Sequence, residues 1–311
     1  MRAGAALAGM GIVAVVLAGS PSALAGSLEP PGPPAPTMKT MDQVEPRIPV
    51  ESLPSSELAR YVINTPGSYY LSSTLYIPAG LHGIHIVNPG GPVTLDLGGF
   101  AVVGQGQDGA GKSGIYVSNA TTLLIKNGAL SKWDSFAVQA SVNNATVEDI
   151  RVSQSGLGII VGFHGIVRRA MVSNCTYAIT GGTGVTVLDS VIDQTGIGVQ
   201  LDYSGRIEGC TISNATDAAI QLYTHGLARG NTLRDGNGIV VTGNQNTVEG
   251  NSCSGTGACV NITGGTGNLV IRNSAVGTTA GNDFPTVGGN FVAPVTSDLA
   301  TAGPWANLSM D

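Results

Sequence analysis

The sequence predicts an all-β fold, a single-stranded right-handed parallel β-helix (a solenoid) with about 20–22 residues per turn. Between Ile115 and Val276, pairs of apolar residues five places apart recur every 20 to 23 residues. A second apolar position keeps the same step. Such a period indicates repeats that bury their apolar faces only by stacking on their neighbours.

Both sets of anchors can be read along the chain. The pairs are Ile125/Leu130, Val147/Val152, Val167/Val172, Val187/Ile192, Ile207/Ile212, Ala228/Leu233, Val248/Cys253 and Ile271/Val276. The second anchors are Ile115, Ala137, Ile159, Ile179, Val199, Ile220, Ile239 and Val260.

The segments between turns are typical of short strands. Runs such as 114–117, 123–125 and 238–241 are rich in Ile, Val and Leu and are bounded by Gly, Asn, Ser and Thr. No segment has an apolar period of 3.6 residues, which excludes helical repeats. Leucine-rich repeats need a denser leucine frame, and left-handed β-helices favour six-residue steps. A right-handed helix with about three strands per turn therefore fits best.

Charged residues form a second periodic pattern. The residue after the first anchor should face outward, because strand side chains alternate between faces. These residues are Lys126, Glu148, Arg168, Leu188, Glu208, Arg229, Glu249 and Arg272, and Asp149, Arg169 and Asp189 lie one place further on. Stacked about 4.8 Å apart, opposite charges would become neighbours that fix the register and add little stability.

The N-terminal segments predict export. Residues 1–25 resemble a secretory signal, with Arg2, an apolar core over 12–18 and a small-x-small cleavage site at 23–25. We expect a secreted or periplasmic protein without a membrane span after cleavage; an uncleaved membrane anchor is the alternative. Residues 26–46 form a Pro-rich linker, either an extended spacer or a disordered end.

The remaining boundaries follow from the repeat. Residues 47–112 should form the N-terminal cap and the first turns, 113–276 the regular repeats and 277–311 the C-terminal cap. Solenoid ends expose unpaired strand edges and need covering. We expect the bulky Phe284, Phe291 and Trp305 to plug the C-terminal end.

Four stretches carry a resemblance to a known family. The stretches 46–50, 65–71 and 93–100 resemble the opening of secreted bacterial right-handed β-helix repeat proteins, and 304–308 resembles their C-terminus. The resemblance covers most of residues 46–311 and implies the pectin-lyase-like fold. It implies function only weakly, because that fold includes lyases, glycosidases, adhesins and tailspikes.

Composition and motifs limit the cofactors and partners. A net charge of −6 argues against nucleic acid. The Gly106–Ser113 stretch matches a phosphate-binding loop but precedes a strand instead of a helix, and the Gly-Gly-Thr-Gly runs at 181–184 and 264–267 lack the aspartate of calcium repeats. We therefore expect no metal and no cofactor, and a monomer.

Two of the four cysteines are candidates for a disulfide. Cys253 and Cys259 flank a five-residue turn that a disulfide would close, and a free pair is the alternative. Cys175 and Cys210 fall on different offsets two repeats apart, which fits a bond poorly.

Polar and aromatic residues on three turns form the candidate glycan-binding surface. Amides, an acid, histidines and rings on one face suit sugar recognition, and an ordinary polar turn face is the alternative. The candidates are Phe163, His164, Gln200, Asp202, Tyr203, Gln221, Tyr223 and His225. Asp202 and His225 are weak candidates for a catalytic acid and base.

Two classes of function stay open. The first is an exported, non-catalytic scaffold at the surface that binds polysaccharide or cell-surface glycan. The second is a uronate lyase or glycoside hydrolase with a non-standard site, although the usual carboxylate sets of such enzymes are absent from the sequence.

Overall fold

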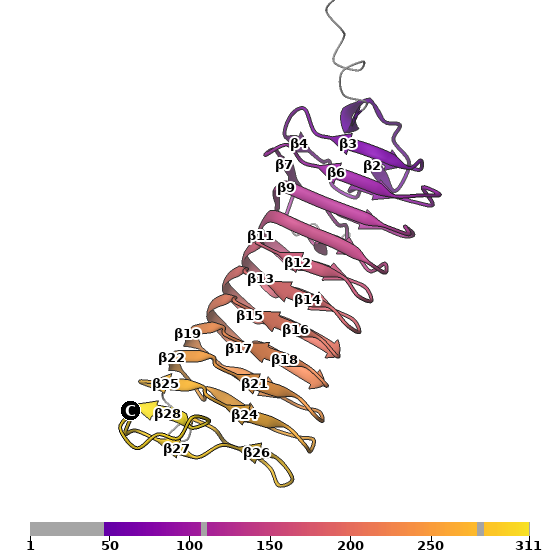
Figure 1. Cartoon of the computed structure of the whole chain (residues 1–311). Coiled ribbons are helices and arrows are strands. Elements are labelled where there is room, and N and C mark those ends of the chain that lie inside the picture. The colour runs from indigo at the N-terminus through magenta and orange to yellow at the C-terminus, as the bar shows by residue number, and fades with distance from the viewer. Residues whose placement is uncertain (1–46, 107–110, 279–282, 311) are drawn as a thin grey trace, which may run out of the picture. The chain divides into compact units, whose positions relative to one another are not determined.

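A computed structural model describes residues 47–106, 111–278 and 283–310 of the chain. The predicted signal segment and the Pro-rich linker lie outside the described residues. Residues 46–311 form one compact unit. In the described part of it the chain winds in successive coils, and strands of one coil pair in parallel with those of the next (Figure 1). The predicted all-β parallel β-helix is confirmed.

The first of three sheets carries the first anchor of each predicted pair, in the register Leu95–Ile125–Val147–Val167 and onward. Its strands are β1 (Ile48–Pro49), β3 (Gly67–Tyr70), β6 (Val93–Asp96), β9 (Leu123–Ser131), β11 (Ala145–Val161), β12 (Ile166–Arg168), β14 (Thr186–Leu188), β16 (Arg206–Glu208), β18 (Leu227–Arg229), β21 (Thr247–Glu249), β24 (Leu269–Ile271) and β26 (Phe291–Val292).

The second sheet carries the second member of each pair, in the register Val102–Leu130–Val152–Val172. It shares β9 and β11 with the first sheet, because these strands continue around a corner. Its other strands are β4 (Leu75–Tyr76), β7 (Ala101–Val103), β13 (Met171–Gly181), β15 (Val191–Tyr203), β17 (Thr211–Thr224), β19 (Thr232–Gly236), β22 (Ser252–Thr256), β25 (Ser274–Val276), β28 (Asn307–Met310) and β27 (Val295–Thr296).

The third sheet carries the remaining anchor, in the register Ile84–Ile115–Val138–Ile159–Ile179. It shares β11, β13, β15 and β17, which bend around a second corner. Its other strands are β2 (Ala59–Ile63), β5 (His82–Ile86), β8 (Ile115–Val117), β10 (Phe136–Ala140), β20 (Ile239–Val241) and β23 (Val260–Ile262). One 3-10 turn, η1 (Val50–Ser52), is the only helix in the described residues.

The core lies between the three sheets and consists of the predicted anchors, which are almost all fully buried. Burial of this apolar surface supplies the main stabilisation. Corners are made by single residues with positive φ, a conformation that Gly and Asn adopt most readily. At the corner after the third sheet these residues are His164, Gly184, Ser204, His225 and Gln245.

Three anchor positions predicted from the sequence, Ala137, Ile271 and Val276, are wrong by one residue. Val138, and not Ala137, is in register with Ile115 and Ile159. Ala137 is buried as well, so hydrophobicity could not separate the two. Near the C-terminus, the last pair is not Ile271/Val276.

That last pair is Val270 and Ala275, which pair with Val248 and Cys253. The outward ladder therefore ends at Ile271, which is in register with Glu249, and not at Arg272. Arg272 occupies the corner, with a φ of 59°, and still reaches Glu249 at 2.9 Å.

The charged ladder pairs in part. Arg168 binds Glu148, and Arg169 binds Asp149 at 2.7 Å. Arg169 holds the pKa of the Asp149 carboxyl below its ordinary value by hydrogen bonding. Arg206 instead binds Glu208 of its own strand at 2.7 Å. Because these side chains are largely exposed, the pairs contribute to register more than to stability.

Two ladders of stacked asparagines run through the C-terminal half of the coil, which the sequence reasoning missed. In the first, each side-chain amide donates to the carbonyl oxygen of the next asparagine at 2.9 to 3.1 Å. Its members are Asn231, Asn251, Asn273 and Asn307, all buried. A second ladder links Asn246, Asn268 and Asn290 at the corner after the third sheet. These ladders satisfy buried backbone groups where the chain turns.

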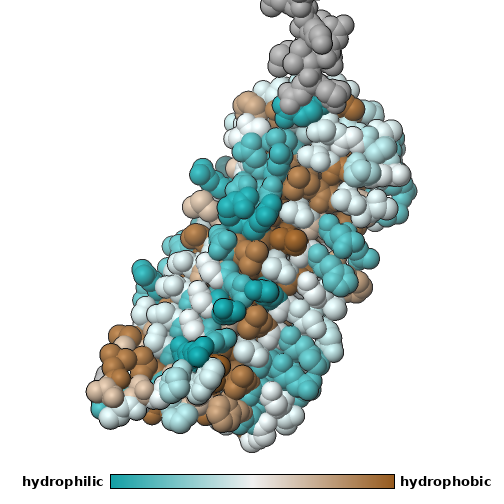
Figure 2. All heavy atoms as spheres, viewed as in Figure 1, coloured by the Kyte–Doolittle hydropathy of each residue, from teal (hydrophilic) through white to brown (hydrophobic). Residues whose placement is uncertain are grey.

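The C-terminal end differs from the predicted plug. Phe284 is buried, but Phe291 and Trp305 are 57% and 53% exposed. The guanidinium carbon of Arg272 lies over the ring of Trp305, 4.1 Å from the ring centroid. Instead β28 inserts between β25 and β27 and pairs with both. Apolar side chains are consequently visible at this end of the stack (Figure 2).

The cysteines behave as small core residues. Cys253 and Cys259 form a disulfide with a Cα–Cα distance of 5.4 Å, and both are fully buried. It ties β22 to the start of β23 across one corner. Cys175 and Cys210 are free and buried. Burial raises the pKa of Cys210 to about 11, so this thiol stays protonated at neutral pH.

Replacement of Asn251 by Ala should lower the free energy of unfolding by about 3 kcal/mol, because the buried backbone N–H of Asn231 loses its acceptor and the side chains of Asn231 and Asn273 each lose a hydrogen bond. The measurement is equilibrium unfolding in urea. Asn119→Ala, which removes one exposed amide contact, serves as the control and should change stability by less than about 0.5 kcal/mol. Equal effects of the two substitutions would contradict a structural role for the ladder.

His82 predicts a loss of stability in mild acid. Its ring is stacked on Tyr116 with 4.6 Å between centroids, and its Nδ1 accepts the backbone N–H of Ser113 at 2.9 Å. Burial, followed by repulsion from Lys112 and His85, lowers the pKa of His82 from 6.5 to about 4. The folded protein therefore favours the neutral ring. The contribution of neutral His82 to the free energy of unfolding is fully present above pH 6.5 and is lost as the pH falls toward 4.

Consequently, His82→Gln should reduce the fall in Tm between pH 7 and pH 4 relative to the unsubstituted protein. Glutamine keeps an acceptor for Ser113 and does not titrate. Thermal unfolding at half-unit pH steps is the measurement, and His164→Gln at an exposed corner is the control that should retain the full fall. Parallel curves for all three proteins would refute the assignment.

Candidate functional site

A surface groove with a volume of about 500 Å³ lies on the outer face of the third sheet. We call it the third-sheet groove. It is lined by parts of four successive coils: Phe136 and Ser141, then Leu157 and Ile160 to Phe163, then Tyr177 and Thr180 to Gly182, and finally Gln200 and Asp202.

Two glycines and an aspartate form one row of the groove, which we call the trough. Val161, Gly181 and Leu201 are in register, so the residues that follow them, Gly162, Gly182 and Asp202, occupy the same position in consecutive coils. The first two lack a side chain, and Asp202 ends the row. A Cβ added at Gly182 would lie 3.0 Å from Cδ1 of Phe163, so this ring lies against the trough.

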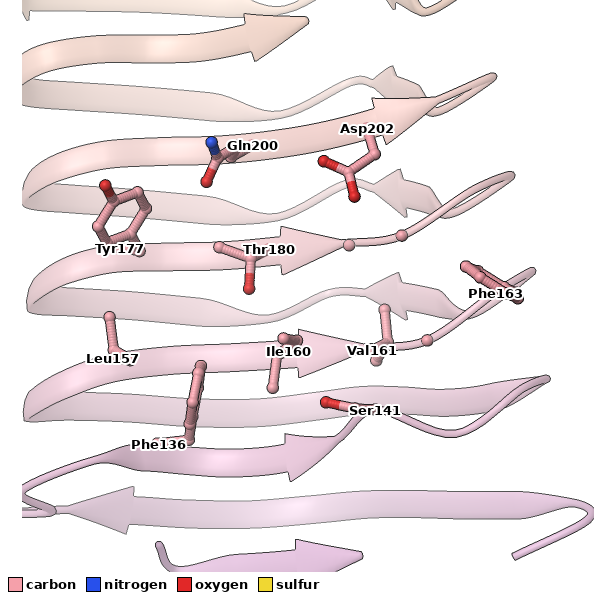
Figure 3. Close-up of a pocket in the computed structure, with 13 residues that line it drawn as sticks. Phe136, Ser141, Leu157, Ile160, Val161, Phe163, Tyr177, Thr180, Gln200 and Asp202 are labelled. Carbon is pink, nitrogen blue, oxygen red and sulfur yellow. The ribbon is translucent and has the colours of Figure 1, made fainter. Parts of the chain in front are cut away.

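Apolar side chains flank the trough. Phe136, Leu157 and Tyr177 stack in register where each coil enters the third sheet. Ile160, Thr180 and Gln200 form the next row toward the trough, and Phe163 and Asp202 lie at the far end of the strands (Figure 3). The groove therefore offers rings and aliphatic surface beside a few hydrogen-bonding groups.

Three of the eight predicted glycan-binding residues line this groove: Phe163, Gln200 and Asp202. Phe163 is 53% exposed, and Asp202 is exposed as well. Gln200 connects the groove to the next coil, because its Nε2 donates to the hydroxyl of Tyr223 at 2.9 Å. The amide of Gln200 is thereby fixed in orientation.

Four further candidates lie beside the groove on the next coils. Tyr203 contacts the ring of His225, with 4.6 Å between centroids. Gln221 is stacked on Gln200 in the register of β15 and β17, and its buried Oε1 has no partner among the described groups. Tyr223 is held by Gln200, so these side chains form a connected patch.

The structure does not bring the two weak catalytic candidates together. Asp202 is in register with Tyr223, whereas His225 lies at the corner position that Ser204 occupies one coil earlier. His164 takes the same corner position three coils from His225, about 14 Å away, and its ring lies over Gly184. Among the contacts of the described residues, none joins Asp202 to His225.

Sequence reasoning missed Phe136, Leu157, Ile160, Tyr177 and the two trough glycines. Their signal was present, because Phe136, Leu157 and Tyr177 are 21 and 20 residues apart, in step with the repeat. This spacing was not recognised because the anchor of that coil was placed at Ala137 instead of Val138. A row of small residues between larger ones at the same offset marks a hollow in a solenoid.

Other predicted motifs take structural roles. Gly184 and Gly267 of the two Gly-Gly-Thr-Gly runs have φ values of 70° and 71° and make corners. The phosphate-loop pattern lies partly outside the described residues, and strand β8 follows it. The described residues contain no cluster of three or more metal-binding side chains, and no helix in them is long and apolar enough to cross a membrane.

Comparison with known proteins gives one match. The family model described as a right-handed β-helix region matches residues 107–276, more than half of the chain. No curated protein and no solved structure matches the chain. The matched segment contains every residue that lines the third-sheet groove.

Proposed function

The chain belongs to the right-handed β-helix family, and from this premise we propose that it is an exported, non-catalytic scaffold that binds glycan in the third-sheet groove. The observation that carries the proposal is the groove itself, in which apolar side chains face hydrogen-bonding groups across a trough made by Gly162 and Gly182. The resemblance of residues 1–25 to a secretory signal supports contact with extracellular glycans.

The chemistry of the lining suits a sugar ring. A pyranose has apolar C–H faces that pack on aromatic rings and equatorial hydroxyls that need polar partners. Phe136, Tyr177 and Phe163 offer rings, while Thr180, Gln200 and Asp202 offer donors and acceptors. All of them project from paired strands or from the corner beside them, so little ordering is required on binding.

Binding is favoured over hydrolysis by the number of acidic groups. Glycosidases place two carboxyl groups about 5 to 9.5 Å apart on either side of the scissile bond. Among the residues lining the groove, Asp202 is the one carboxylate, and neither arginine nor lysine is present to act as the base of a lyase. The groove therefore has the composition of a recognition site.

Filling the trough should abolish binding. Gly182→Val brings a side chain against the Phe163 ring, because an added Cβ lies 3.0 Å from its Cδ1, so this ring must shift and the groove changes shape. The backbone φ of Gly182 is compatible with valine. We expect at least a tenfold loss of affinity in isothermal titration with the best ligand from a glycan array. Gly288→Val, at an exposed glycine with no atom within 4 Å of an added Cβ, is the matched control.

The aromatic walls can be tested in the same assay. Tyr177→Ala and Phe163→Ala should each weaken binding about fivefold to tenfold through the loss of ring stacking. Tyr76→Ala, at a 73% exposed ring on the second sheet, should leave affinity unchanged. The proposal fails if no glycan binds, or if binding survives Gly182→Val unchanged. New reducing ends or unsaturated uronates released by the protein would instead establish an enzyme.

A further inference from the structure

The charge of the third-sheet groove narrows the class of ligand, an inference that rests on the proposed function. We infer that the groove binds an uncharged polysaccharide, not a uronate, and that the carboxylate of Asp202 accepts hydrogen bonds from the hydroxyl groups of this ligand. Three features of the groove support this: the sign of its charge, the placement of the nearby cations, and the position of Asp202 along the trough.

The groove has one ionisable acid and no fixed positive charge. Of the residues lining it, Asp202 is the single acidic one, and it is exposed at the end of the trough. A sugar carboxylate bound next to it would meet a like charge. At about 4 Å this repulsion weakens binding roughly fivefold even in water, and further in a partly desolvated groove.

The arginines of the same coils lie away from the groove. Arg151 is on the second sheet, in register with Ala129 and Met171. Arg168 and Arg169 bind Glu148 and Asp149, and Arg206 binds Glu208. These pairs belong to the first sheet and the corner that follows it, while the groove lies on the third. Recognition of a carboxylate calls for a guanidinium or ammonium group at the site, and the lining of the groove supplies neither.

Asp202 is placed to bind hydroxyl groups. It follows Gly162 and Gly182 in the same row and lies at the strand end beside the groove, where its carboxylate is exposed (Figure 3). An ionised carboxylate accepts two or more hydrogen bonds from neighbouring hydroxyls, and such charge-assisted bonds are about twice as strong as neutral ones. Gln200, held by Tyr223 at 2.9 Å, lies two residues earlier on the same strand and can complete the contact.

The test compares uncharged and acidic polymers. Titrations at low ionic strength use oligosaccharides of glucan, xylan, mannan and galactan as the uncharged probes, and oligogalacturonate and oligoalginate as the acidic ones. The native sequence should bind at least one uncharged probe and bind the acidic probes at least fivefold more weakly. Asp202→Asn should weaken binding of the uncharged ligand about tenfold. It should also reduce the difference in affinity between the uncharged and the acidic probes.

Asp217→Asn is the matched control, because it makes the same change of charge at an exposed acid outside the groove and should alter neither affinity. Tighter binding of acidic probes that is lost in Gly182→Val would overturn this inference and leave the proposed function intact. An affinity for the uncharged ligand that Asp202→Asn does not change would also overturn it. Absence of binding to every probe would instead remove the proposed function.

Discussion

Parallel stacking of identical positions at about 4.8 Å is the constraint on which the rest of this protein depends. Each coil buries Val, Ile and Leu only against the coils on either side of it, so any position is repeated along the stack. Repetition turns the chemistry of one residue into a row. Opposite charges become ladders such as Glu148–Arg168, and buried amides become ladders such as Asn231–Asn251. A residue that differs from its counterparts in the neighbouring coils therefore interrupts its row, and the stack must accommodate it.

The sequence was sufficient for the period, the parallel sheets and most of the core, because apolar anchors at a step of 20 to 23 residues leave few other arrangements. It failed where two adjacent residues were equally apolar, as at Ala137 and Val138, and both proved to be buried. The asparagine ladders were missed for a different reason. Asn also favours exposed turns, and only the fold shows that Asn251 turns inward and bonds the coils above and below. Phe291 and Trp305 were assigned to a plug by size alone, yet insertion of β28 lengthened the second sheet instead.

The candidate site was predictable only in part, because a groove is formed by several rows of residues together and no single row reveals it. Phe163, Gln200 and Asp202 stood out individually as polar or aromatic residues at turns and strand ends. The trough between them contains Gly162 and Gly182, and its flank contains Leu157 and Tyr177, which look like ordinary strand residues. Asp202 and His225 were close in the sequence pattern but fall on different rows, since the strand side chains and the corner residue project from different parts of the coil.

The same stacking explains why one carboxylate can decide the chemistry of the groove. In the ladders of the first sheet, Glu148 and Asp149 are paired with Arg168 and Arg169 one coil away. The row of Asp202 contains glycine before it and Tyr223 after it, so no neighbouring coil supplies a countercharge from that row. An acid left without a partner in a regular stack contributes nothing to register and exposes its acceptors to solvent. Its two oxygens then remain available for a ligand, and the ligand best suited to them presents hydroxyl groups and no negative charge.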